Sequence, residues 1–232
     1  MHATRDPKAM AKTLRQALAE RHTEISHSES LELVARQLGW RDWNTLAAQM
    51  DRPPLRLPEG WFPSGSMRDD YDMGLDEAEG CALIRYRHVS PIPISGQGSG
   101  FGTLMQGVQA EAYRGARIQL KAQIKAQDVT GAGTLWMRVD DARGRTIAFD
   151  NMETRRTDGP LLGTSGWQDR SIVLDVPDDA AVVSFGFYLR GSGSLWARRF
   201  RFGVVDASVP LTDSYGGRHR PEPVNLDFAA VA

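Results

Sequence analysis

The chain is short of the residues that mark several common protein classes. Its 232 residues include 1 cysteine, Cys81, which excludes an intramolecular disulfide and a zinc site built from cysteines. A formal net charge of -1 gives no bulk attraction to nucleic acid or to an anionic membrane. No apolar run approaches the ~20 residues that a membrane-spanning helix needs, and the amino-terminal segment has no apolar signal core. These absences predict a cytoplasmic protein that is not in a membrane.

Signatures of catalysis are also lacking. There is no G-x-S-x-G nucleophile motif, and His88 and His219 stand alone in the sequence. His22, Glu24 and His27 lie around a turn between two predicted helices, and no ligand beyond these three is visible, which favours a solvated turn over a metal site. We therefore predict no catalytic residue, no metal ligand and no cofactor. A cryptic hydrolase stays open as an alternative, because sequence does not give the separation of two carboxylates.

Strict alternation of polar and apolar residues is the strongest pattern present. It runs through Arg117–Lys125 and predicts a strand with one wet face, since successive side chains of a strand point to opposite sides. The segment 128–133, rich in glycine, predicts a turn, and 134–140 alternates again. With 146–150 as a third strand, the pattern predicts a β-meander at the centre of the fold.

Further short alternating or β-rich segments are spaced along the rest of the chain, with turn residues between them. This spacing is typical of a β-sandwich or jelly roll. The fold class predicted is mostly β, an antiparallel jelly-roll sandwich preceded by a small three-helix domain. The additional predicted strands are 71–75, 82–86, 101–110, 167–176, 183–190 and 195–205.

The amino-terminal residues have helical rather than alternating periodicity. Asp6 followed by Pro7 predicts a first helix start, Ser28 a second and Asp42 a third. Gly39 is a natural residue to end the second helix. Three short helices are thus expected to form a compact unit.

Composition divides the chain into four parts. Residues 1–50 form the helical module, and the proline-rich segment 51–58 is a stiff linker. Residues 59–205 form the sandwich. The pattern ends at 206–232, which predicts a flexible carboxy-terminal tail.

The helical segment from Ser26 to Leu46 carries a resemblance to a known family. With Gly39-Trp40-Arg41-Asp42-Trp43 at its most specific part, it resembles the small helical module appended to some glyoxalase-superfamily proteins. The resemblance does not extend to the metalloenzyme domain of that superfamily, whose paired βαβββ units and ligands are not seen in the sequence.

Several runs in the β region carry a second resemblance: Phe101–Gln106, Tyr113–Gly115, Leu135–Asp140, Phe149–Met152, Gly163-Thr164, Trp167 and Ser171–Pro177. Together they resemble a domain of bacterial proteins labelled transcriptional regulators, in some of which this domain follows an AraC-type DNA-binding region. The similarity covers most of residues 59–205. In fold this region resembles galactose-binding and carbohydrate-binding-module jelly rolls, which implies architecture but no chemistry. Trp196-Ala197-Arg198 departs from the pattern, which has an acidic residue soon after the Trp.

Three residues on the wet faces of their strands form the first candidate site. Trp136, Arg138 and Tyr188 would make an aromatic and guanidinium surface if their strands share a sheet. Aromatic rings stack on the apolar face of a sugar, and Arg donates to hydroxyls or carboxylates. The alternative is that both aromatic rings pack under a loop or under the helical module.

Acidic and amide side chains after the meander form the second candidate. Asp150 and Asn151, with Asp140 and Asp141, offer oxygen ligands of the kind that calcium prefers. The alternative is turn chemistry, in which these side chains bond to their own backbone. No dense acidic loop motif is present, so we predict no metal at this place. We predict that Asp150 and Asn151 contact a ligand.

These observations predict a non-enzymatic protein with two parts. The sandwich is expected to bind an unknown small ligand, such as a carbohydrate, or a protein partner, and the helical module to mediate an interaction of a regulatory kind. The alternative is a transcription-associated regulator that contacts DNA through its helices. That alternative is less favoured, because the third predicted helix begins with Asp42, Trp43 and Asn44 rather than with cations.

Overall fold

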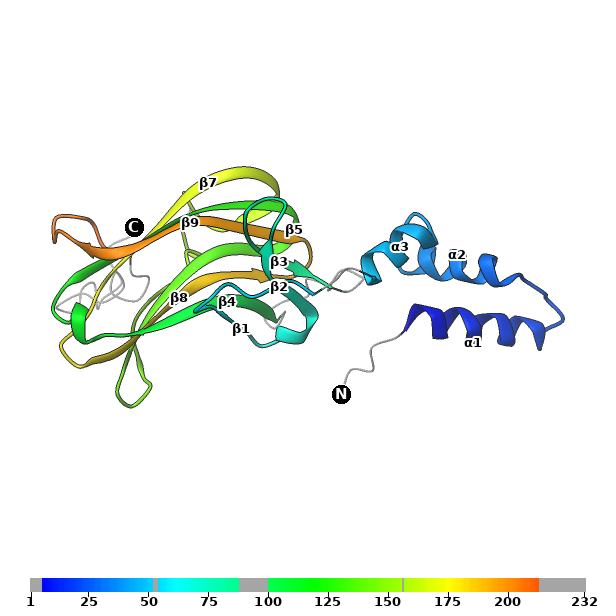
Figure 1. The fold of residues 1–232 in the computed structure, drawn as a ribbon, viewed down its shortest axis with the longest axis horizontal. Helices are drawn as coiled ribbons and strands as arrows, with labels where there is room; N and C mark the ends of the chain where they lie inside the picture. The colour runs from blue at the N-terminus through cyan, green and yellow to red at the C-terminus, as the bar shows by residue number, and fades with distance from the viewer. Residues whose placement is uncertain (1–5, 52–53, 88–99, 156, 213–232) are drawn as a thin grey trace, which may run out of the picture. The chain divides into compact units, whose positions relative to one another are not determined.

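A computed structural model describes residues 6–51, 54–87, 100–155 and 157–212. The chain divides into two compact units, one built on Met1–Pro54 and the other on Leu55–Tyr86 and Pro93–Ala232. The first is helical and the second is made of strands (Figure 1). The mostly β fold class with three preceding helices is therefore confirmed. Most of the predicted tail, 206–232, lies outside the described residues.

The helical unit contains α1 (Pro7–Ala19), α2 (His27–Gln37) and α3 (Trp43–Met50). Each helix begins with a side chain that accepts a hydrogen bond from a free backbone N–H group. The caps are Asp6, Ser26 and Asp42. The second cap is thus Ser26 rather than the predicted Ser28, because Ser26 Oγ lies 3.1 Å from the backbone N of Glu29.

Packing in the helical unit depends on small and branched residues. Ala11, Val34, Ala35 and Leu46 are buried, and Gly39, with φ +84°, follows the end of α2 in the left-handed conformation. Leu33 is 41% exposed, because the adjacent Val34 points to the core. Among the described residues, no helix is long and apolar enough to cross a membrane.

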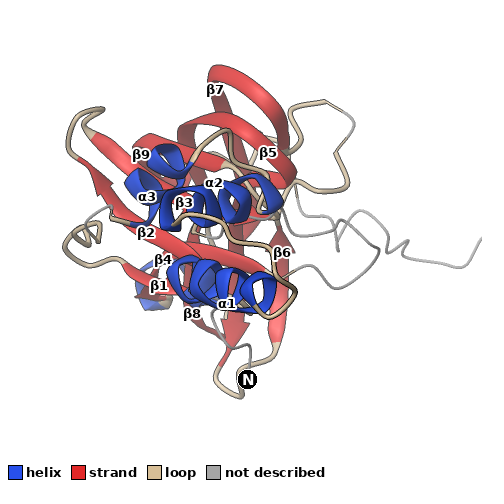
Figure 2. Cartoon of the chain, turned by 90° about the vertical axis from the view of Figure 1, so that its right-hand side faces the viewer, coloured by secondary structure: helices blue, strands red, loops and turns tan. Residues whose placement is uncertain are grey.

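The β unit is an antiparallel sandwich whose two sheets share one long strand, β5 (Figure 2). The amino-terminal half of β5 pairs with β7 and β9, and its carboxy-terminal half pairs with β8 and β6. The first sheet has the order β7-β5-β9-β3-β2, and the second has the order β1-β4-β8-β5-β6. The strands are β1 (Phe62–Ser64), β2 (Tyr71–Asp76), β3 (Cys81–Tyr86), β4 (Phe101–Gln109), β5 (Arg117–Asp141), β6 (Thr146–Asp150), β7 (Leu161–Asp175), β8 (Ala180–Arg190) and β9 (Ser194–Val205), with short 3-10 helices at Arg68–Asp70 and Glu111–Tyr113.

The predicted turn at 128–133 is wrong. β5 continues for 25 residues from Arg117 to Asp141, and its halves pair with other strands rather than with each other. The chain does bend there, since the pairing register with β7 shifts three times between Ile124 and Gly133. The predicted meander is therefore replaced by one strand that passes from the first sheet to the second.

The glycines of this bend permit close approach of neighbouring strands. A Cβ atom on Gly131 would lie 2.5 Å from the carbonyl oxygen of Arg190, and one on Gly133 would lie 2.7 Å from Leu195 Cδ1. Glycine in a strand marks such contacts as well as turns, and the local sequence does not distinguish the two.

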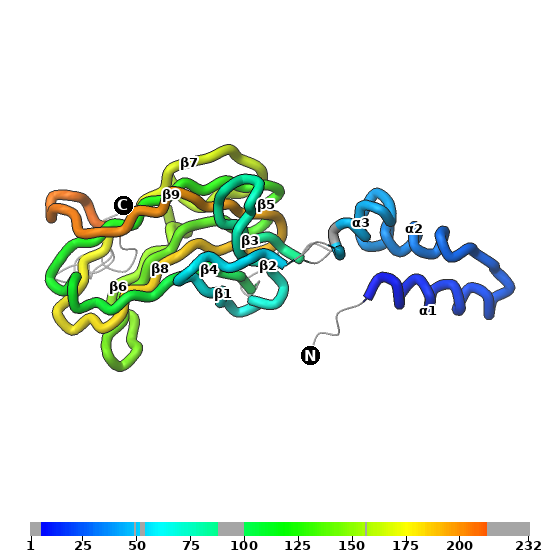
Figure 3. Tube along the Cα trace, viewed as in Figure 1, coloured from blue at the N-terminus to red at the C-terminus, as the bar shows by residue number. Residues whose placement is uncertain are grey.

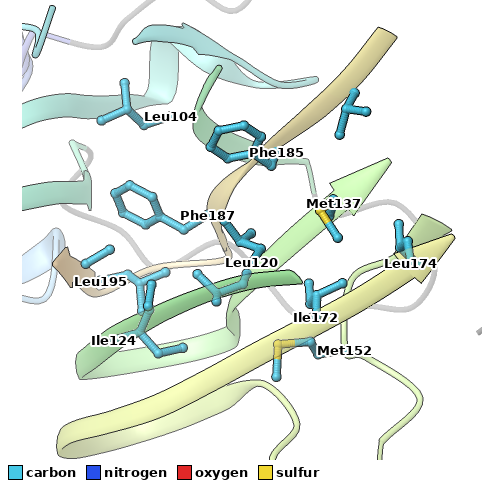
Figure 4. Packing of buried hydrophobic residues seen from close by; sticks show 14 of the residues in the cluster. Leu104, Leu120, Ile124, Met137, Met152, Ile172, Leu174, Phe185, Phe187 and Leu195 are labelled. Atoms are coloured by element: carbon cyan, nitrogen blue, oxygen red, sulfur yellow. The ribbon is translucent and has the colours of Figure 1, made fainter. Parts of the chain in front are cut away.

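The core lies between the two sheets. The apolar side chains predicted to point inward from β5 are buried, including Ile118, Leu120, Ile124 and Met137. They pack against residues of both sheets, among them Phe187 of β8 and Leu174 of β7 (Figure 4). The alternation of the sequence thus identifies the residues of β5 that face the core, although outward residues such as Trp136 of β5 and Val173 of β7 are buried as well.

Candidate ligand-binding site

The outer face of the second sheet carries the first predicted site. Trp136, Arg138 and Tyr188 all lie on this face, since their neighbours Leu135, Met137, Val139, Phe187 and Leu189 are fully buried between the sheets. The strands that carry them, β5 and β8, are paired. The three residues therefore lie on one surface, as predicted for strands that share a sheet.

Trp136 does not present its ring to solvent, because only 7% of the residue is exposed. Its Nε1 donates to Thr103 Oγ1 of β4 over 2.8 Å. Since β8 lies between β4 and β5, the indole crosses β8, where Gly186 pairs with Trp136 on one side and with Met105 on the other. Phe101, Met105 and Phe149 pack around this small outer cluster. Trp136 is thus covered by its neighbours on the outer face and offers no open ring for stacking on a ligand.

Tyr188 is also 7% exposed, but its hydroxyl is part of a polar cluster. The hydroxyl donates to Glu153 and accepts from Asn151 Nδ2 over 3.3 Å. Arg190 Nη1 lies 2.9 Å from Glu153 Oε1, so Glu153 joins the tyrosine to a guanidinium. Burial, reinforced by the Glu153 carboxylate, raises the pKa of Tyr188 well above its usual range. Tyr188 therefore stays protonated and acts as a hydrogen-bond donor.

Asp150 is buried beneath the loop that follows β6. Its carboxylate accepts from the backbone N of Met152 over 2.7 Å and pairs with Arg155. Arg155 also donates to the backbone oxygen of Ser171 on β7 over 2.8 Å. Asp150 thus anchors the loop over the sheet edge, while Asn151 reaches Tyr188.

The predicted acidic residues are not gathered into a calcium site. Asp140 accepts from Arg138 and Thr146, and Asp141 accepts from the backbone of the turn after β5. These backbone hydrogen bonds hold the pKa of Asp141 below its usual range. Within the described ranges, no group of three histidine, cysteine, aspartate or glutamate residues is placed to hold a metal ion.

A cavity of about 360 Å³ opens beside the polar cluster. Glu153 and Arg190 line it, so the cluster that includes Tyr188 and Asn151 borders the cavity. Gly131, Gly159 and Leu162 also line it, and Leu162, which is 62% exposed, gives the wall an apolar part. The volume lies within the range of small-molecule sites, roughly 300–1,000 Å³.

Of the five predicted site residues, the structure brings Tyr188 and Asn151 to this cluster. Arg138, whose side chain is 42% exposed, pairs with Asp140, and Trp136 and Asp150 have structural partners. Sequence reasoning missed Glu153 and Arg190. The alternation of β8 gave a signal for Arg190, since it shares the outer face with Tyr188, whereas Glu153 lies in an irregular loop without a pattern.

The comparisons with known proteins agree with both resemblances. Residues 1–72 match the family model described as "Glyoxalase superfamily protein". A curated relative from Bacillus subtilis (strain 168), named "Uncharacterized HTH-type transcriptional regulator YbfP", is 39% identical over 176 residues, which is 73% of this chain. The chain spans about half the length of that relative, 56%.

Solved structures similar to the chain include carbohydrate-binding modules. The structure titled "CBM4 structure and function" is 18% identical, with a TM-score of 0.43 over 68% of this chain and 97% of that one. The CBM22-1–GH10 modules of Clostridium thermocellum xylanase 10B are 13% identical, with a TM-score of 0.42 over 65% of this chain and 27% of that one. The strand pairing of the chain itself, rather than these likenesses, defines its sandwich.

Proposed function

We propose that the chain is a non-enzymatic binding protein whose β unit takes up a small polar ligand, such as a neutral sugar, in the cavity beside Glu153 and Arg190. The observation that carries this proposal is that Glu153 and Arg190 line the cavity as a pair, with Tyr188 and Asn151 hydrogen-bonded behind Glu153. A carboxylate and a guanidinium together accept from and donate to the hydroxyl groups of one ligand.

The same cluster supports binding rather than chemistry. Of the residues that line the cavity, Glu153 is the single carboxylate, and it is paired with Arg190 and Tyr188. Hydrolysis of a glycoside by the usual route needs two carboxylates on either side of the bond. Both partners hold Glu153 as a hydrogen-bond acceptor.

The proposed role is regulatory and cytoplasmic. The relative from Bacillus subtilis is named as an HTH-type transcriptional regulator, and a bacterial transcriptional regulator works in the cytoplasm, where the chromosome lies. In this proposal the β unit senses the ligand and the helical unit engages a further partner.

Binding is tested by calorimetric titration of the full chain with a panel of neutral mono- and disaccharides. At least one sugar is expected to bind, and Glu153→Gln is expected to weaken it by about tenfold, because hydrogen bonds to charged groups contribute roughly 1.5–3 kcal/mol. Glu111→Gln, the same change at an exposed residue outside the cavity, is the matched control. Absence of binding, or equal affinity in the Glu153 variant, contradicts the proposal.

A second candidate function is DNA contact through the helical unit. It is favoured by the name of the relative and by the succession of α2, a short turn and α3. It predicts duplex DNA binding by the full chain that falls steeply with salt and is weakened by Arg36→Ser. Binding that is unchanged by this substitution, or absent at low salt, contradicts it.

A further inference from the structure

A second surface of the β unit, on the outer face of the first sheet, combines tryptophans with cations. It lies on β7, β5 and β9, which run side by side (Figure 3). Trp167, Lys125, Trp196 and Arg198 form its centre. All four are partly exposed, whereas their neighbours Ile124, Ala126, Leu195 and Ala197 are buried in the core.

The four central side chains are packed against one another. The guanidinium carbon of Arg198 lies 3.9 Å from the centroid of the Trp167 ring, and Lys125 Nζ lies 4.5 Å from that of Trp196. Trp196 is fixed further by a 2.9 Å hydrogen bond from Nε1 to Asp76. Cations held over indole rings in this way are oriented before any ligand arrives.

A bulge in β9 adds cations to the edge of this centre. The register passes from Lys121 opposite Arg201 to Gln123 opposite Arg198, so two residues of β9 face one residue of β5. Arg199, with φ +55°, is one of the two, and the other, Phe200, packs against the core. The bulge therefore keeps the aromatic residue inside while Arg198, Arg199 and Arg201 remain outside.

The edge cations lack acidic partners. Lys121, Arg199 and Arg201 are exposed, and in the part of the chain that the structure describes they form no ion pair. Lys125 is paired with Glu79, and Arg198 donates to Gln123. We call these three residues and the four central ones the tryptophan–cation face. Three carboxylates border its five cations, namely Glu79 at Lys125, Asp76 at Trp196 and Asp169 opposite Gln123, so the surface stays positive although the net charge of the chain is -1.

We propose that the tryptophan–cation face binds single-stranded nucleic acid. The exposed arginines and Lys121 contact phosphates, and the accessible parts of Trp167 and Trp196 stack on bases. Single strands are bound in this way elsewhere, by aromatic rings interleaved with cations. Unpaired bases have free ring faces, whereas the bases of a duplex are covered by their neighbours, so the tryptophans favour a single strand.

The proposal is tested with the full chain and a fluorescein-labelled oligothymidylate of about 15 nucleotides, near the upper site size of one small domain. Anisotropy is expected to rise on binding, and the affinity to fall linearly with salt on logarithmic axes. The double variant Arg199→Gly/Arg201→Ser is expected to lower the steepness of that slope by about 1.4, because each phosphate contact on a single strand contributes about 0.7. Trp167→Ala is expected to weaken binding by about fivefold or more.

Controls separate this surface from other sources of affinity. Arg143→Ser removes an exposed cation of the turn after β5 and is expected to leave the affinity unchanged. Thermal midpoints of all variants check that the fold persists. No binding of the oligonucleotide, equal binding by the double variant, or tighter binding of a duplex or of polygalacturonate would each overturn the proposal.

Discussion

Met152 fixes the loop that borders the cavity. It is fully buried in the main core although it belongs to the irregular segment after β6, and its φ of +64° is unusual for a side chain of its size. Its neighbours Asn151 and Glu153 reach the polar cluster. Burial of the Met152 side chain thus positions Asn151 and Glu153.

Met152→Ala is expected to lower the free energy of unfolding by about 2–5 kcal/mol, because it leaves a cavity in the core. It should also weaken ligand binding, since the loop loses its anchor. Urea denaturation followed by fluorescence measures the first effect. Met50→Ala, at a methionine that is 39% exposed, is the control and is expected to have little effect; a similar loss in both variants would contradict the role of Met152.

Asp76 makes stability depend on pH. The hydrogen bond from Trp196 holds the pKa of Asp76 below the usual range of an aspartate. Because the folded-state pKa is the lower one, the stabilisation is present above about pH 4 and is lost as the pH falls further, when the carboxylate becomes protonated. Asp76→Asn should therefore show a smaller fall in thermal midpoint between pH 5 and pH 3 than the parent protein. An identical fall in both would refute this.

β5 is the element that joins the two sheets. It is apolar on one face along both halves, and its bend needs residues without side chains where β8 and β9 approach. The bend also places Gly131 and Ala132 at the cavity wall. The architecture and the site therefore depend on the same segment.

Gly131→Ala tests this role. Its Cβ would lie 2.5 Å from a backbone oxygen of Arg190, so the strands must separate, and a loss of about 1–3 kcal/mol in the free energy of unfolding is expected. Gly166→Ala, where nothing lies within 4 Å and φ is not positive, should be neutral or raise stability by up to about 1 kcal/mol. Denaturant titration of both variants measures the free energy of unfolding. An unchanged value for Gly131→Ala would contradict the close approach of the strands.

Strand faces could be predicted from the sequence, but strand partners could not. Alternation correctly assigned the inward residues of β5, β7 and β8, because it depends on local geometry alone. The misread turn at 128–133 and the burial of Trp136 both depend on residues distant in sequence, such as Arg190 and Thr103. For the same reason Glu153 was missed, since its position is set by Met152 in the core.

At the scale of the whole molecule, the chain has two units with separate cores. Leu46 is fully buried in the helical unit, and Phe187 is fully buried in the sandwich. The buried residues that pack around Phe187 all come from the β unit. Damage to one core is therefore expected to spare the other.

Leu46→Ala is expected to lower the thermal stability of the helical signal, followed by circular dichroism at 222 nm, by the equivalent of about 2–5 kcal/mol. The affinity for a cavity ligand should not change. Phe187→Ala is the matched control variant: it is expected to weaken ligand binding and to leave the stability of the helical signal unchanged. Loss of ligand binding in Leu46→Ala would show that the units depend on each other.

Ligand binding at the cavity beside Glu153 and Arg190 is the central proposed property of this protein. The most direct test is a two-dimensional ¹H–¹⁵N spectrum of the full chain, titrated with the panel of neutral mono- and disaccharides. The account predicts that the amide signals of Gly131, Glu153 and Gly159 shift with one sugar, while the indole signals of Trp167 and Trp196 stay in place. Unchanged spectra with every sugar, or shifts confined to residues away from the cavity, would contradict it.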